Sequence, residues 1–249
     1  MVAPGQEALA RRVVANCPEY AIAIIEGQVG RASLADQMWS VIPWVSATVE
    51  HPSDKGADMA RYGEHHKPDT RRRILGVAGR RLKRDGIDAS GIAALMHDAD
   101  LTNGAFYAHF ASKEDLVTAT ITEQIGGQRA SIAALPPGRA GLEQVVRSYL
   151  SREHRDDPGS GCPSAALLDE IGRCPDAVRR AYTDGMVGLI DDLAARLAPT
   201  DRSAARVLVF TVFATMVGTL QLSRALTDRE LSDAILEQGL EHALTLLRP

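Results

Sequence analysis

The sequence predicts an all-α protein, and three observations support this fold class. Proline and glycine divide the chain into segments of helical length. Within these segments apolar residues recur at three and four positions, and no sustained alternation of period two indicates a sheet. The hydrophobic share of 45% and the charged share of 24% are ordinary for a folded soluble protein. A chain of 249 residues is long enough for one or two domains.

Short helices are expected in the first part of this all-α fold. Apolar residues from Asp69 to Arg84 share one face, so this segment predicts the first helix. Ser90 is a suitable N-cap for a second, short helix. Thr102 caps a third helix that runs to about Phe110, and Ser112 begins a fourth with a capping box. Two short helices joined by a tight turn and supported by a third are typical of a helix-turn-helix, whose second helix enters the major groove of DNA.

The third predicted helix is unusual because it concentrates aromatic residues in a chain with only 4 Phe, 5 Tyr and 2 Trp. Phe106 and Phe110 are four residues apart, so they face the same side and are expected to hold the helix on the first one. Tyr107 is about a hundred degrees around the axis and is expected to be exposed. Gly104 costs about 1 kcal/mol in a helix relative to alanine, which indicates that something approaches the backbone closely there, and a DNA backbone or base edge would fit.

Polar residues around this helix supply candidate DNA contacts. Asn103 next to Thr102 can pair with adenine, whereas Tyr107 and His109 can donate to phosphate oxygens. Lys113 is expected at the N-terminus of the fourth helix, where phosphate is favoured. Each residue taken alone is equally typical of core packing or of a solvated surface.

Net charge also constrains a DNA-binding function. The chain carries a net charge of −4, so contact with a polyanion requires a local basic patch. The segment 59–116 has a net charge of +2 and includes the Arg71–Arg73 cluster. We expect Arg71 to contact a phosphate, although a solvated helix face is the plain alternative for these arginines.

The chain beyond Pro136 predicts a second, larger and acidic helical domain. Its expected helices are around 142–150, around 167–171, 178–197, 202–225 and 228–247. The apolar run 207–222 contains several polar residues and falls short of a membrane span, so we interpret it as a buried helix.

The three cysteines are too few and too scattered for a disulfide framework or a zinc site, which favours a reducing, cytoplasmic location. Cys162 and Cys174 each precede a proline, so both are candidates for helix N-termini, where a thiol becomes more reactive. A redox or electrophile sensor is therefore one hypothesis, and small buried structural cysteines are the other. No catalytic, cofactor-binding or metal-ligating motif is present, so we expect neither an enzyme nor a cofactor.

The segment "TRRRILGVAGRRLKRDGIDASGIAALMHDADLTNGAFYAHFASKEDLV" resembles the TetR/AcrR family of bacterial transcriptional regulators over about residues 67–120. The resemblance implies a homodimer that binds a palindromic operator and a C-terminal domain that binds a small-molecule inducer. It also implies that the last two helices form the dimer interface. By position in the motif, the residues expected at DNA are Ser90, Thr102, Asn103, Gly104, Ala105, Tyr107, His109 and Lys113. The family usually has glycine in the turn where this chain has Asp100, and a left-handed residue is expected there.

The sequence therefore predicts an N-terminal three-helix helix-turn-helix DNA-binding domain at 59–120. A larger C-terminal helical ligand-binding and dimerisation domain is predicted at 121–249. Residues 1–58 show no sustained periodicity, and we expect a loosely ordered extension or a translation start that lies at Met59 instead. The predicted function is a ligand-released repressor. The competing class is a helical small-molecule-binding protein that has the motif without using it on DNA. For 207–222, the central helix of a monomer is the alternative to a dimer interface.

Overall fold

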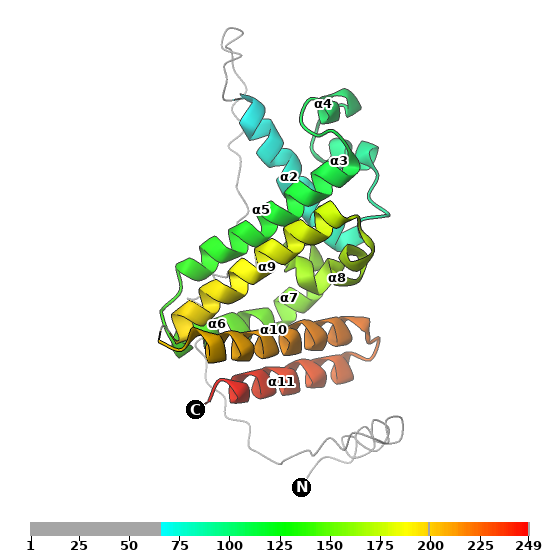
Figure 1. The fold of residues 1–249 in the computed structure, drawn as a ribbon. Coiled ribbons are helices and arrows are strands. Elements are labelled where there is room, and N and C mark those ends of the chain that lie inside the picture. The colour runs from blue at the N-terminus through cyan, green and yellow to red at the C-terminus, as the bar shows by residue number, and fades with distance from the viewer. Residues whose placement is uncertain (1–65, 199, 249) are drawn as a thin grey trace, which may run out of the picture. The chain divides into compact units, whose positions relative to one another are not determined.

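The computed structural model describes residues 66–198 and 200–248, and all regular structure in these residues is helical. The expected extension 1–58, the proposed start at Met59 and Cys17 lie outside the described residues. The described helices, shown in Figure 1, are α2 His66–Asp85, α3 Ile92–Asp98, α4 Asn103–Tyr107, α5 Lys113–Ala133, α6 Arg139–Tyr149, α7 Arg152–Asp156, the 3₁₀ turn η2 Pro158–Ser160, α8 Pro163–Arg173, α9 Asp176–Leu197, α10 Arg202–Ala225 and α11 Arg229–Leu246. The predicted all-α class is confirmed.

Helices α2, α3 and α4 pack around one small apolar core. Its buried members come from α2, α3, α4 and the start of α5, and they are Ile74, Leu75, Ala78, Leu95, Met96, Ala99, Phe106, Phe110 and Leu116. This core is the expected helix-turn-helix. A short helix such as α4 is unstable alone in water, so this packing holds it in place.

Two boundaries in this region differ from the sequence prediction. The N-cap of α3 is Gly91, and the Ser90 hydroxyl instead donates to the Gly86 carbonyl at 2.7 Å, so the predicted cap at Ser90 is wrong. Helix α4 ends at Tyr107, three residues before the predicted end at Phe110. The predicted cap at Ser112 is confirmed, because its side chain accepts the Asp115 N–H at 3.1 Å.

The turn between α3 and α4 contains Asp100 with a φ of 52°, so the expected left-handed residue is present. The Asp100 N–H donates to the His97 carbonyl at 3.0 Å, and the Leu101 N–H donates to the Met96 carbonyl at 2.9 Å. This pair of hydrogen bonds is the Schellman motif, in which glycine is usual at the position of Asp100. An aspartate there carries the steric cost of the left-handed region.

Replacing Asp100 with glycine should therefore raise the free energy of unfolding by about 0.5 to 1 kcal/mol, because glycine adopts this conformation without the steric cost of a Cβ. Urea denaturation of the full-length protein measures the change. The control is Asp100→Ala, which keeps the Cβ in the left-handed region and should give no gain. Equal stability of the glycine and alanine variants would show that the Cβ at position 100 carries no steric cost in the left-handed conformation.

Helices α5 and α9 lie side by side, as do α10 and α11, and they enclose the larger apolar core of the chain (Figure 1). The five helices predicted beyond Pro136 correspond to α6, α8, α9, α10 and α11, and α10 has the predicted bounds. The short α7 and η2 were not predicted. Helix α5 contributes Leu116 to the small core and Val117 to the large one, so the proposed domain boundary at residue 120 falls inside a continuous helix.

Helix α10 differs from the buried helix that its apolar run predicts. One face is in the core, whereas Val207, Phe210 and Leu222 are 69%, 63% and 61% exposed. By length and composition α10 also satisfies the criteria for a membrane-spanning helix, which core helices of soluble proteins satisfy as well. No other described part of the chain therefore covers this apolar face of α10.

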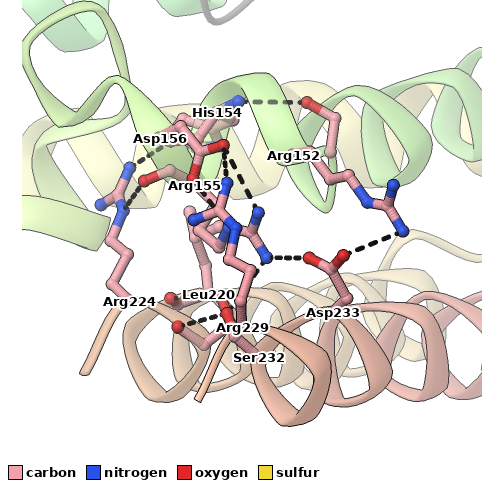
Figure 2. A network of polar contacts seen from close by, with 11 residues as sticks. Arg152, His154, Arg155, Asp156, Leu220, Arg224, Arg229, Ser232 and Asp233 are labelled. Carbon is pink, nitrogen blue, oxygen red and sulfur yellow. Dashed lines mark hydrogen bonds and ion pairs between the residues drawn. The ribbon is translucent and has the colours of Figure 1, made fainter. Parts of the chain in front are cut away.

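A polar network attaches α7 to α10 and α11, and Figure 2 shows Arg155 near its centre. Arg155 is 3% exposed, and its guanidinium donates to Ser232 Oγ at 3.0 Å and pairs with Asp233 on α11. It also contacts Asp156 at 2.8 Å. Arg224 on α10 donates to the Arg155 and Ala165 carbonyls, both at 3.0 Å. Since buried guanidinium groups need such partners, this network fixes the position of the short α7.

Candidate nucleic-acid interface

The exposed surface of α4 carries the side chains that the sequence predicts at DNA. Thr102, Asn103 and Gly104 at its N-terminal end are exposed, and Ala105 is half-buried. Tyr107 is 68% exposed, so its hydroxyl reaches outward as expected. A hydroxyl, an amide and a phenol thus share the solvent side of a helix whose other side is buried.

Two phenylalanines hold α4 in this orientation. Phe106 and Phe110 are 0% and 2% exposed, and their ring centroids are 5.7 Å apart. The predicted anchoring role of both rings is confirmed by their burial in the core shared with α2. Tyr107 contacts the edge of Phe106 with the centroids 5.1 Å apart, so the exposed ring is oriented by the buried one.

Arg71 occupies a more internal position than a phosphate contact requires. Its Nη1 donates to the His109 carbonyl at 2.7 Å, and its guanidinium carbon is 4.2 Å from the centroid of the Phe110 ring. A cation over an aromatic face and a hydrogen bond to a carbonyl just after α4 both stabilise this end of α4. The side chain therefore connects α2 directly to the segment that follows α4.

Gly104 has open space on its side of the helix. A Cβ built at this position meets only Thr102 Oγ1, at 3.9 Å. The packing of this protein therefore does not require glycine there, although glycine destabilises a helix. The approach of a partner to the backbone at Gly104 stays a prediction.

The remaining expected contacts occupy different environments. Lys113 is half-buried at the start of α5, and its ammonium group lies 3.4 Å from the Asp88 carbonyl. His109 is also half-buried. Ser90 is 0% exposed, because its hydroxyl closes the turn after α2, and we leave it out of the proposed DNA contacts.

The positions and environments of the two described cysteines do not favour the sensor hypothesis. Cys162 is the N-cap of α8 as expected, but it is 1% exposed. Cys174 is the C-cap of α8 and lies one residue before Pro175, the N-cap of α9, so it is next to the predicted helix N-terminus and does not cap it. Burial and the carboxylates of Asp88, Glu170 and Glu114 raise the pKa of the Cys174 thiol, which opposes thiolate formation. The 11-residue α8 separates the cysteines by about 18 Å, too far for a disulfide.

Sequence reasoning missed the buried Lys83 and the half-buried Glu170. Lys83 is 5% exposed, and burial lowers its pKa to about 8. Glu170 on α8 accepts the Ile87 N–H at 2.7 Å. Lys83 is one of several cations on α2, and nothing in its local sequence distinguishes it from the solvated ones.

A neutral histidine fixes the loop before α8. The Cys162 N–H donates to His154 Nε2 at 3.0 Å, so the ring proton is on Nδ1, which donates to the Tyr149 carbonyl at 2.7 Å. Burial lowers the pKa of His154 to about 4, in agreement with a neutral ring. These contacts are structural and lie within the C-terminal core.

Together, the buried phenylalanines and the exposed polar face of α4 define a helix-turn-helix protein of the DNA-binding class. The sequence of residues 74–120 matches the family described as bacterial regulatory proteins, tetR family. These residues therefore form an N-terminal domain of the TetR-family type, and TetR-family transcriptional regulators share the fold of the chain.

Solved structures share the fold. A TetR-family regulator from Agrobacterium tumefaciens is 24% identical, with 71% of this chain and 98% of that chain covered and a TM-score of 0.59. The reduced form of NemR from E. coli is 21% identical, with 70% and 95% covered and a TM-score of 0.58. FadR from Bacillus subtilis, in complex with stearoyl-CoA, is 17% identical, with 68% and 97% covered and a TM-score of 0.50. No curated protein matches the sequence.

Proposed function

We propose that this regulator is a dimeric repressor that binds a palindromic operator and leaves it when a small molecule binds the C-terminal domain. The observation that carries the DNA-binding part is the exposed face of α4, where Asn103, Gly104 and Tyr107 are held outward by two buried phenylalanines. Thr102, Ala105, His109 and Lys113 complete the proposed interface. Arg71 uses one N–H on the His109 carbonyl and has others for a phosphate.

The proposed dimer uses α10 and α11. The exposed apolar side chains Val207, Phe210 and Leu222 on α10 support this surface, because monomers rarely leave such a stripe uncovered. Two copies related by a two-fold axis would space the recognition helices one DNA turn apart, about 34 to 36 Å. These exposed residues favour the dimer over the alternative of a central helix in a monomer.

The proposed domains are a DNA-binding part up to about residue 120 and a ligand-binding and dimerisation part from there to residue 249. FadR with stearoyl-CoA supports the proposal that the C-terminal part of such a fold holds a small molecule. A ligand that prefers a dimer with different helix spacing lowers DNA affinity by its differential binding energy. We propose a regulator in the cytoplasm with no enzymatic activity.

The sensor alternative has less support than the ligand-released repressor. Cys162 is buried, and the raised pKa of Cys174 opposes its reaction with oxidants or electrophiles. Replacing both cysteines with serine should leave DNA binding before and after oxidant treatment unchanged. Loss of an oxidant response in that variant would instead favour the sensor.

A mobility-shift assay with DNA selected from a random duplex pool tests the DNA-binding part. Tyr107→Ala should lose at least about 1 kcal/mol of binding free energy, because one specific contact is removed. Gly104→Ala should also weaken binding, whereas the stability of the protein should be unchanged or higher, since alanine favours a helix by about 1 kcal/mol. Affinity should fall steeply with salt.

Both outcomes of this assay are decisive. No shift with the wild type on any selected duplex would favour the competing class, a helical small-molecule-binding protein without DNA function. Full affinity in both variants would mean that α4 is not the reading helix. Thr122→Ala, at an exposed position near the middle of α5, is the matched control and should bind like the wild type.

A further inference from the structure

Helix α8 contacts the C-terminal end of α2 through polar groups at both of its ends. At the first end, Lys83 Nζ on α2 donates to the carbonyl of Gly161, the residue before the α8 N-cap, at 2.7 Å. At the second end, Glu170 Oε2 accepts the N–H groups of Ile87 at 2.7 Å and Asp88 at 3.2 Å. We call these two contacts the Lys83 anchor and the Glu170 anchor.

The Lys83 anchor is held rigidly from the C-terminal side. Gly161 lies against the His154 ring so closely that a Cβ would overlap its Nε2 atom. The same nitrogen accepts the Cys162 N–H, and Arg224 reaches the His154 carbonyl from α10 (Figure 2). The Lys83 ammonium is buried and donates to Gly161 and to Gln124 Oε1 at 2.8 Å. A buried ammonium that loses such partners is costly, so α2 is tied to this loop.

The Glu170 anchor is fitted to the end of α2. Gly86 follows α2 with a φ of 91°, and a Cβ there would be 2.8 Å from Glu170 Oε1. The carboxylate therefore covers the turn that leads from α2 to α3, and its charge faces backbone N–H groups that have no partner in a helix. Beside it a cleft of about 210 Å³ opens between Lys113 and Val178. Leu82 and Ile87 also pack in the larger core with Ile171 of α8, so the polar anchor fixes a contact that apolar packing supports.

The N-terminal end of α2 meets the recognition helix. Arg71 donates to the His109 carbonyl just beyond α4, and the buried residues of α2 pack on Phe106 and Phe110. A displacement of α8 therefore displaces the end of α2, and a rigid α2 transmits the displacement to α4. Both ends of α8 must keep their bonds for this arrangement to persist.

We propose that α8 sets the orientation of the DNA-binding helices through the Lys83 and Glu170 anchors, and that both are positioning residues for DNA binding. This inference rests on the proposed DNA-binding function and adds the element through which the C-terminal domain acts on it. Because coupling between two sites is reciprocal, operator DNA bound at α4 must also stabilise α8.

The test uses hydrogen exchange of the full-length protein with and without a saturating selected duplex. In the wild type, DNA should slow amide exchange in residues 161–174, which are outside the proposed DNA contacts. Glu170→Ala should lose this protection at equal DNA occupancy and bind the duplex at least fivefold more weakly. A purely structural role would lower affinity but leave the protection at saturation intact.

The matched control is Asp169→Ala, which removes the same charge from the same helix. Asp169 is exposed and pairs only with Arg173 in the described part of the chain. Its affinity should stay within twofold of the wild type and its DNA-dependent protection should remain. Should Glu170→Ala fail to fold by circular dichroism, Lys83→Gln takes its place with the same expected loss. Retention of both affinity and protection in the anchor variant overturns the proposal.

Failure of the proposed function gives a different pattern. If the wild type binds no duplex at all, DNA binding is refuted. The coupling through the two anchors is then tested by hydrogen exchange of the proteins without DNA. Amide exchange in residues 91–107 should be faster in Glu170→Ala than in the wild type and in Asp169→Ala. Equal exchange in all three proteins would refute the coupling through α8.

Discussion

Replacing Phe106 with alanine should lower the free energy of unfolding of the DNA-binding helices by about 3 to 5 kcal/mol. The ring is fully buried, contacts Phe110 and holds the five-residue α4 against α2. Because so short a helix has little stability of its own, the cavity should release it and abolish DNA binding. Urea denaturation and a mobility-shift assay on a selected duplex measure the two effects.

The neighbouring residue supplies the control for Phe106. Tyr107→Ala removes an aromatic ring from the same helix, but that ring is 68% exposed. Its stability should stay within about 0.5 kcal/mol of the wild type, although its DNA affinity falls. Similar destabilisation by the two variants would contradict the division of α4 into a buried anchoring face and an exposed reading face.

Replacing Arg155 with alanine should cost about 3 kcal/mol or more of stability, because removing one member of a buried charge network strands the others. The lost guanidinium pairs with Asp233 and donates to Ser232 on α11, and it contacts Asp156 on its own helix. Urea denaturation at one fixed protein concentration measures the loss, since dimerisation would otherwise contribute to the apparent stability.

Arg152 is the matched control on the same helix. Its side chain is 57% exposed and pairs with Asp233 and Glu237, so it is a surface ion pair. Arg152→Ala should cost no more than about 1 kcal/mol. An equal cost for both arginines would mean that burial of Arg155 does not decide the stability of the α7 to α11 contact.

Helix boundaries were predictable where local chemistry decides them. The bounds of α10 follow from its apolar period, and Ser112 caps α5 through its own side chain, as its sequence indicates. The prediction failed at the end of α4, because the helix ends at Tyr107 and the N–H groups of His109 and Phe110, which both donate to the Phe106 carbonyl, form only a closing turn. It failed at Ser90 as well, because the hydroxyl donates to the Gly86 carbonyl instead of accepting an N–H at the start of α3.

By itself, the sequence determined the all-α class, the family motif and the outward orientation of Tyr107 on α4, because periodicity and residue type act within a few positions of the chain. Only the tertiary structure decided that Lys83 is buried against Gly161, that Glu170 caps the turn after α2 and that one face of α10 stays exposed. These contacts join residues about 80 positions apart, and a side chain carries no local mark of the distant carbonyl or amide that will meet it.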